Sequence, residues 1–250
     1  MNETENSLLG GKVRLLQKQD GYRTAIDPVL LAAAVPAKAG EEVLDLGCGV
    51  GAVSLCLHTR VSGLKITGLD VQKPLVDLAR RNSALNNCDE DMLFVNGDIL
   101  NPQKELNEAK FDHVMANPPY FLANSGTMSP DAAKASSNVE SDAGLVDWVR
   151  LAHRVLKTRG SITFIHRADR VADLIAAFYD SFGGLIIFPL WPSLGKEAKR
   201  VIVTARKGVV SPTRISPGLV LHKEDGSFSD QAQGILKKAA TLRVSQKPFS

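Results

Sequence analysis

Short apolar segments alternate with helix-like segments over most of this 250-residue chain, and this alternation restricts the possible folds more than any other feature. Strand-like runs bounded by Gly, Pro, Asn or Asp are predicted at residues 43–46, 65–70, 92–95, 111–116 and 161–166. Helix-like patterns are predicted at residues 52–59, 74–86, 145–156, 171–182 and 231–242. Repeated strand–helix units favour a parallel sheet with helices on both faces.

Two late strands, at residues 185–188 and 200–205, have no helix between them. A loop containing Pro192 and Gly195 joins them, and a loop of this kind connects antiparallel neighbours. The predicted fold is therefore α/β: a doubly wound, mostly parallel seven-stranded sheet with an antiparallel edge strand. In such a sheet ligands bind beyond the carboxyl ends of the strands.

The length allows one large domain or two small ones, and we expect a single domain over residues 1–242, followed by a flexible tail at 243–250. Hydrophobic residues make up 44% of the chain, enough for a full core. The longest apolar run, at residues 29–35, is far shorter than the ~20 residues that cross a bilayer, and the polar N-terminus lacks a signal-peptide pattern. The 3 cysteines lack metal-ligand spacing. We therefore expect a cytoplasmic protein with no membrane partner, no disulfide and no metal.

A glycine-rich loop follows the first strand and begins the first helix of this pattern. It contains Gly47, Gly49 and Gly51, preceded by Asp45. Glycines let a backbone approach a ligand closely, and the helix behind them offers free N–H groups. The loop fits the Gly-x-Gly-x-x-Ala pattern of dinucleotide binding and also the Asp-x-Gly-x-Gly-x-Gly pattern of S-adenosylmethionine binding. In both interpretations Asp70, after the second strand, binds ribose hydroxyls, while Asp45 favours S-adenosylmethionine.

The fourth strand ends in Asn117-Pro118-Pro119-Tyr120. The two prolines hold the backbone extended and remove two N–H donors. The Asn117 side-chain oxygen and the Pro118 carbonyl can then each accept a hydrogen bond from one planar amino group, which directs the nitrogen lone pair at a methyl donor. Tyr120 offers a face on which a base can stack, worth ~1–3 kcal/mol. A sulfonium methyl donor needs no strong base, so positioning supplies much of the catalysis.

Together, the Asn-Pro-Pro-Tyr sequence and the upstream glycine loop resemble class I methyltransferases that use S-adenosylmethionine and act on exocyclic or amide nitrogens. The resemblance implies a Rossmann-like fold and the catalytic residues Asn117, Pro118 and Tyr120. Asn117 would also border the cofactor, as would Val71. Asp98, in an Asn-Gly-Asp turn, would bind the cofactor's adenine amino group. A nicotinamide cofactor has no use for this turn.

The segment at residues 19–32 resembles the G-[FY]-[RK]-x(3)-D-x-x-L-L-A segment of the bacterial valine tRNA (adenine-N6)-methyltransferase group, and the similarity extends over residues 12–242. In that group the segment packs beside the cofactor pocket. The resemblance therefore implies that residues 1–40 cap the cofactor site and that Tyr22, Arg23 and Asp27 form part of its wall. We also expect Asp27 to cap a helix that starts at the next residue.

Charge is unevenly distributed, because residues 150–210 hold 11 Lys and Arg but only 4 Asp and Glu. Such a balance favours a polyanionic partner such as RNA. The candidate substrate-binding residues lie next to strand ends: Arg167, Arg170, Lys196, Lys199 and Arg200.

The expected function is methyl transfer to an exocyclic amino nitrogen, with adenine N6 in tRNA as the acceptor, by a monomer or homodimer. The alternatives are methylation of a protein glutamine, an rRNA base or a small molecule, and a non-catalytic RNA-binding protein with the same fold. Glutamine enzymes of this type carry a larger domain before the glycine loop, and the intact Asn117 argues against loss of catalysis.

Overall fold

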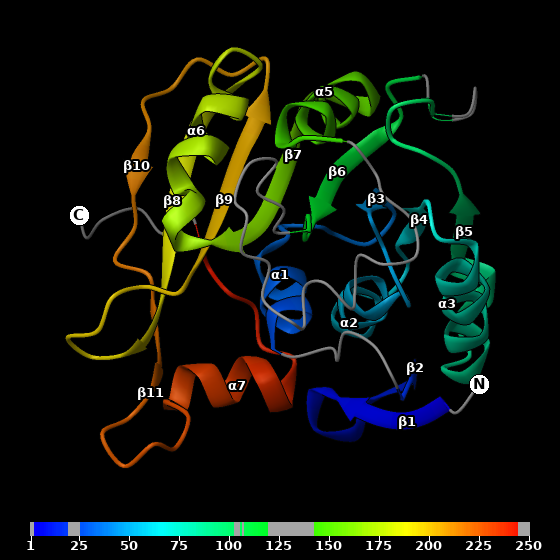
Figure 1. The fold of residues 1–250 in the computed structure, drawn as a ribbon, viewed down its shortest axis with the longest axis horizontal. Helices are drawn as coiled ribbons and strands as arrows, with labels where there is room; N and C mark the ends of the chain where they lie inside the picture. The colour runs from blue at the N-terminus through cyan, green and yellow to red at the C-terminus, as the bar shows by residue number, and fades with distance from the viewer. Residues whose placement is uncertain (1–2, 20–25, 103–105, 107, 120–142, 245–250) are drawn as a thin grey trace, which may run out of the picture.

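The computed structural model describes residues 3–19, 26–102, 106, 108–119 and 143–244. A nine-stranded sheet runs through it in the order β10-β8-β9-β7-β6-β3-β4-β5, with β11 also paired to β8 (Figure 1). Its strands are β3 (Glu42–Leu46), β4 (Lys65–Asp70), β5 (Met92–Asn96), β6 (Phe111–Ala116), β7 (Leu156–Arg167), β8 (Phe182–Ser193), β9 (Arg200–Lys207), β10 (Arg214–Ile215) and β11 (Leu219–His222).

The α/β class is confirmed, but two details of the predicted sheet are wrong. Strand β9 is antiparallel to both neighbours, β7 and β8, so the antiparallel strand lies inside the sheet and not at its edge. It fills the position between β7 and β8, which run in the same direction. The sheet has nine strands and not seven, because β10 and β11 add short parallel pairings to β8. Both are short and follow prolines, Pro212 and Pro217, so the sequence analysis assigned no strand there.

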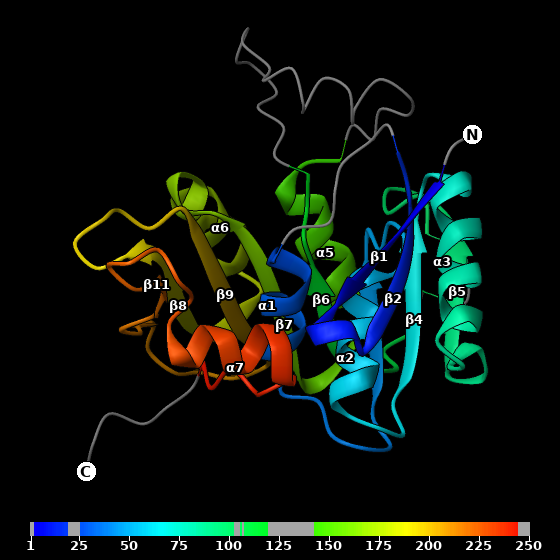
Figure 2. The same cartoon turned by 90° about the horizontal axis from the view of Figure 1, so that it is seen from below.

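Helices cover both faces of the sheet (Figures 1 and 2). Side chains from α1, α2, α3 and α7 share one core with Met115 and Ile165, whereas α5 and α6 share another with Val114 and Phe164. Val114 and Met115 are consecutive residues of β6, and Phe164 and Ile165 are consecutive residues of β7. Because successive strand residues point to opposite faces, the two cores lie on the two sides of the sheet. The helices are α1 (Asp27–Ala34), α2 (Ala52–Arg60), α3 (Lys73–Leu85), α5 (Leu145–Val155), α6 (Val171–Tyr179) and α7 (Asp230–Lys238), with short 3-10 turns η1 (Leu9–Gly11), η2 (Asp89–Asp91) and η4 (Ala168–Arg170).

An N-terminal hairpin of β1 (Glu3–Leu8) and β2 (Val13–Lys18) forms a separate two-stranded sheet, which the sequence did not predict. The fully buried Asn82 of α3 fastens it. Its side-chain oxygen accepts a hydrogen bond from Leu16 N at 2.8 Å, and its amide donates to Leu16 O at 3.1 Å and to Val50 O at 2.9 Å. The hairpin is thereby tied to the glycine loop.

The residues that follow α7 pack against the protein core. Leu242 N donates to Ala33 O at 2.8 Å, and the Val244 side chain is buried in the core that α1 shares. Within the described ranges no helix is both long and apolar enough to cross a membrane, and no cluster of His, Cys, Asp or Glu could hold a metal ion.

Candidate active site

The glycine loop joins β3 to α2 through three left-handed residues. Gly47, Gly49 and Gly51 have φ angles of +65°, +54° and +82°, which other residues adopt only at a cost. Gly47 N and Cys48 N both donate to Leu69 O, at 2.8 and 3.0 Å. The loop is therefore folded tightly over the end of β4, which is the neighbour of β3.

The glycines differ in the space around them. A Cβ at Gly47 would lie 2.4 Å from Cη2 of Trp148, whereas a Cβ at Gly49 would meet nothing within 4 Å. Trp148 belongs to α5 and is almost fully buried, so it supports the loop from the α5 side. Open space remains at Gly49.

Asp70 is fixed at the end of β4 by two backbone donors. Gly49 N donates to one carboxylate oxygen at 2.9 Å and Gln72 N to the other at 2.8 Å. Burial raises the pKa of Asp70, and these two hydrogen bonds oppose the rise. Each oxygen retains a second lone pair as an acceptor.

Asp45 lies deeper, with its side chain bonded to Ser54 of α2. Ser54 Oγ donates to its carboxylate at 2.7 Å. Burial raises the pKa of Asp45 to about 7, with a further contribution from the charge of Asp70. Ser54 was not expected from the sequence, because nothing marks it beyond its place in the first turn of α2.

Asp98 lies in the turn after β5, and Val71 directly follows β4, so both lie at the same edge of the sheet. Asn96 Nδ2 donates to Asp70 O at 3.0 Å and to Val71 O at 2.8 Å, which joins this turn to the end of β4. The Asp98 carboxylate accepts from Leu100 N at 2.9 Å. Asn96 is a further residue that the sequence analysis did not single out.

Asn117, Pro118 and Pro119 follow β6 directly, and β6 is paired with β3. Asn117 is half-buried, Pro118 buried and Pro119 exposed. Asn117 lies one residue past the end of β6, where Ala116 is paired with Leu46 at the end of β3. Of the other predicted site residues, Tyr22, Arg23 and Tyr120 lie outside the described residues.

An ion pair joins the start of α1 to the start of β9. Arg200 Nε lies 2.9 Å from an Asp27 carboxylate oxygen, and the Asp27 side chain is only 8% exposed. Pro28 occupies the first turn of α1 as predicted, but the helix begins one residue earlier than expected, so Asp27 is its first residue and Ile26 takes the N-cap position. The pair unites two segments that the sequence analysis treated separately, as cofactor wall and substrate contact.

Removing Arg200 is expected to destabilise the fold, because Asp27 would lose the cation that offsets its burial. We expect Arg200→Ala to lower the free energy of unfolding by about 2 kcal/mol. Lys199→Ala, at the exposed neighbouring position, should stay within about 0.5 kcal/mol of wild type. Urea denaturation measures both. Equal stability of the two variants would contradict a structural role for this pair.

The remaining candidate cations gather at the same edge, beyond the carboxyl end of β7. Arg167 lies opposite Arg200 in the β7–β9 register and pairs with Asp169 through Nε at 2.9 Å. Lys199 O accepts from Ala168 N at 3.2 Å, and the Lys199 side chain is exposed. The structure therefore brings together the cations that the sequence analysis proposed from separate segments.

Comparison with known proteins decides the family. Residues 24–169, more than half of the chain, match the sequence profile of the methyltransferase small domain. The chain belongs to this family. The matched region extends from just before α1 to just after β7, and so includes the glycine loop, Asp70 and the Asn117-Pro118-Pro119 turn.

Relatives of this methyltransferase domain share about a quarter of its sequence. A tRNA1(Val) (adenine(37)-N6)-methyltransferase of Porphyromonas gingivalis is 26% identical over 219 residues, covering 84% of this chain and 85% of its own. One of the same name from Aeromonas salmonicida is 28% identical over 214 residues, covering 84% and 86%.

Solved structures agree on the fold. A protein described as a predicted O-methyltransferase, from Agrobacterium tumefaciens, superimposes with a TM-score of 0.71 at 26% identity, covering 87% of this chain and 98% of its own. A tRNA (m1A58) methyltransferase from Aquifex aeolicus gives a TM-score of 0.56 at 15% identity, covering 78% and 73%. The second likeness concerns the fold alone.

Proposed function

We propose that this methyltransferase domain transfers a methyl group from S-adenosylmethionine to N6 of an adenine in tRNA. The observation that carries the proposal is the Asn117-Pro118-Pro119 turn at the end of β6, beside the glycine loop at the end of β3. The names of the relatives from Porphyromonas gingivalis and Aeromonas salmonicida support the choice of tRNA adenine N6.

The residues at the ends of β3 and β4 fit S-adenosylmethionine. Open space at Gly49 lets backbone approach the ligand, and the fixed Asp70 carboxylate is an acceptor suited to two ribose hydroxyls. Gly47, Gly51, Asp45, Val71 and Asp98 complete the cofactor-binding set. When bound, the cofactor supplies an electrophilic methyl group on a positively charged sulfur.

The acceptor is positioned by the motif turn. The Asn117 side-chain oxygen and the Pro118 carbonyl accept the two N–H groups of the adenine amino group, so its lone pair is held toward the methyl donor. Tyr120 provides the stacking face. Tyr22, Arg23 and Asp27 line the wall nearest α1, within a single domain that spans residues 1–242.

A polynucleotide substrate should meet the cations at the carboxyl edge. Arg200 is a poor probe of this contact, because it pairs with buried Asp27. Lys196 and Lys199 are exposed and take part in no ion pair shown by the described residues. We expect Lys196→Glu with Lys199→Glu to weaken tRNA binding tenfold or more at low salt, since phosphate contacts release counterions, while the affinity for S-adenosylmethionine stays unchanged.

A matched control replaces Lys38 and Arg159 with Glu; both are exposed and lie near the starts of β3 and β7, at the opposite edge of the sheet. This pair should leave tRNA affinity within about twofold of wild type at matched ionic strength. Titrations at several salt concentrations measure both effects. Equal losses from the two double variants would show that net charge, and not this edge, governs RNA binding.

Labelled S-adenosylmethionine tests the substrate class directly. Purified protein is incubated with tRNA, rRNA, bulk protein and small-molecule extract in parallel, and methyl incorporation is counted. The proposal expects label in tRNA. Label confined to protein or to small molecules would contradict it.

A further inference from the structure

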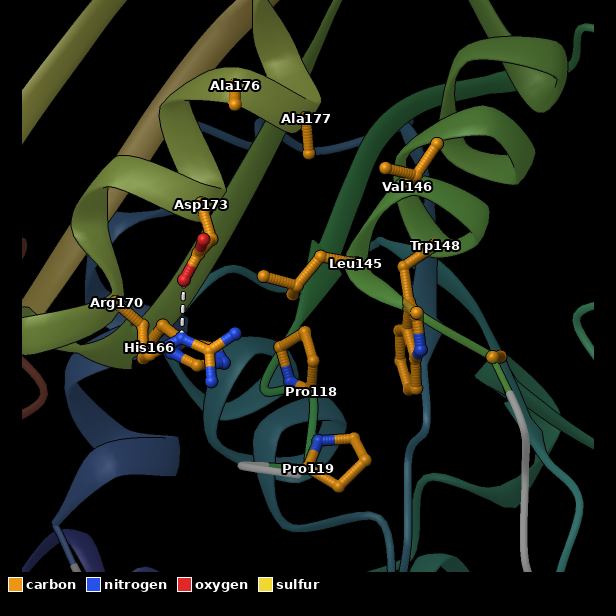
Figure 3. A pocket seen from close by; sticks show the side chains of 12 residues that line it. Pro118, Pro119, Leu145, Val146, Trp148, His166, Arg170, Asp173, Ala176 and Ala177 are labelled. Atoms are coloured by element: carbon orange, nitrogen blue, oxygen red, sulfur yellow. Dashed lines mark hydrogen bonds and ion pairs between the residues drawn. The ribbon is translucent and has the colours of Figure 1, made fainter. Parts of the chain in front are cut away.

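A cleft lies between α5 and α6, next to the Asn117-Pro118-Pro119 turn. It has a volume of about 390 Å³, within the ~300–1,000 Å³ range of small-ligand sites. Figure 3 shows it between α5 and α6, with Pro118 and Pro119 among the side chains that line it. Pro118 therefore belongs both to the proposed acceptor turn and to this cleft.

The walls of the cleft are largely apolar. Trp148 and Leu145 come from α5, Ala176 and Ala177 from α6, and the two proline rings complete the lining (Figure 3). Such a surface suits a flat, weakly polar group. Among the described lining residues, only Arg170 carries a positive charge that could pair with a phosphate or a peptide carboxylate.

Polar groups occupy one side of the cleft. His166, at the end of β7, is 2% exposed, and burial lowers its pKa to about 4, so the imidazole is neutral at physiological pH. Its ring therefore adds an uncharged edge to the lining of the cleft. Arg170 and Asp173 form an ion pair beside it, which adds donors and acceptors. Donors and acceptors next to an apolar slot match the edge of a nucleobase.

We propose that this cleft binds the base of the nucleotide adjacent to the methylated adenine. The inference rests on the proposed function, because it requires an RNA strand whose target base has left the stack. A base so extruded leaves its neighbours unstacked, and an unstacked base is recognised by stacking on side chains and by hydrogen bonds to its edges. The Pro118–Pro119 turn then separates the target base from its neighbour, and the cleft selects the sequence around the target.

The test combines a cleft-filling variant with abasic RNA. A stem-loop substrate is made with its target adenine intact and with either neighbouring base removed while sugar and phosphate remain. For the wild-type enzyme we expect one of the two abasic RNAs to raise KM about tenfold or more, the typical loss of one stacked base. Ala177→Leu should raise KM for the intact RNA to the same level and should abolish the difference between intact and abasic RNA.

Ala172→Leu is the matched control, because it makes the same change on α6 at an exposed position that does not line the cleft. It should keep the wild-type preference for intact RNA, and all variants should keep the wild-type affinity for S-adenosylmethionine. If Ala177→Leu fails to fold, the more exposed Ala176→Leu fills the same cleft.

Equal methylation of intact and both abasic RNAs by the wild type would overturn the inference and leave the proposed function standing. So would a cleft-filled variant that still distinguishes intact from abasic RNA. Methylation of no RNA at all would remove both the proposed function and this inference.

Discussion

Asn117→Ala is expected to lower the rate of methyl transfer by about 100-fold or more, the typical cost of a lost hydrogen bond that acts in the transition state. Asn117 lies one residue past β6 and is half-buried, so its truncation should leave the fold intact. The affinity for S-adenosylmethionine should change little, because Asp70 and the glycine loop lie on β4 and β3. Single-turnover kinetics and calorimetry measure the two quantities.

Asn96→Ala provides the contrast for this experiment. Asn96 donates to Asp70 O and Val71 O and so supports the cofactor side, and its loss should weaken S-adenosylmethionine binding more than the chemical step. Near wild-type turnover by Asn117→Ala would contradict the amino-group mechanism.

Gly47→Ala is expected to destabilise the protein by about 2–5 kcal/mol. Its φ of +65° costs an L-residue roughly 1–2 kcal/mol, and its Cβ would lie 2.4 Å from the buried Trp148 ring, where overpacking adds about 1–3 kcal/mol. Thermal and urea denaturation measure this loss. Trp148→Phe in the same background should recover part of it by removing the contact atom.

Gly49→Ala should act differently, although it changes the same loop. Its φ of +54° carries a similar backbone cost of roughly 1–2 kcal/mol, but no atom lies within 4 Å of the new Cβ. We expect the fold to survive and the affinity for S-adenosylmethionine to fall by about tenfold or more, because the methyl group enters space proposed for the cofactor. Equal stability of the two alanine variants would be inconsistent with the packing of Trp148.

The sequence predicted where β3, β4 and β6 end, because the glycines and prolines that follow β3 and β6 restrict the backbone locally. The turns that begin at Gly47 and Asn117 are marked in the sequence by residues with special backbone conformations. Strand order is harder to predict, since the place of β9 depends on where the crossover through α6 leaves β8. An apolar run such as that of β9 has the same pattern at an edge and in the interior of a sheet.

Contacts between distant segments could not be predicted at all. Arg200 looked like a phosphate contact because it lies in a basic stretch, yet its nearest acidic partner is Asp27, which is far away in the sequence. Asn82 gave no signal in an amphipathic helix, although it fastens the hairpin to the glycine loop. Such pairs become visible only when the packing of the whole fold is known.

Identifying the atom that receives the methyl group tests the proposed function most directly. Transfer RNA lacking its natural modification is methylated with labelled S-adenosylmethionine, digested to nucleosides and separated by chromatography with mass detection. The account predicts that the label co-elutes with N6-methyladenosine and is absent when the Asn117→Ala variant replaces the wild type. Label in a ribose 2′-O-methyl nucleoside, in N1-methyladenosine or in no nucleoside would contradict it.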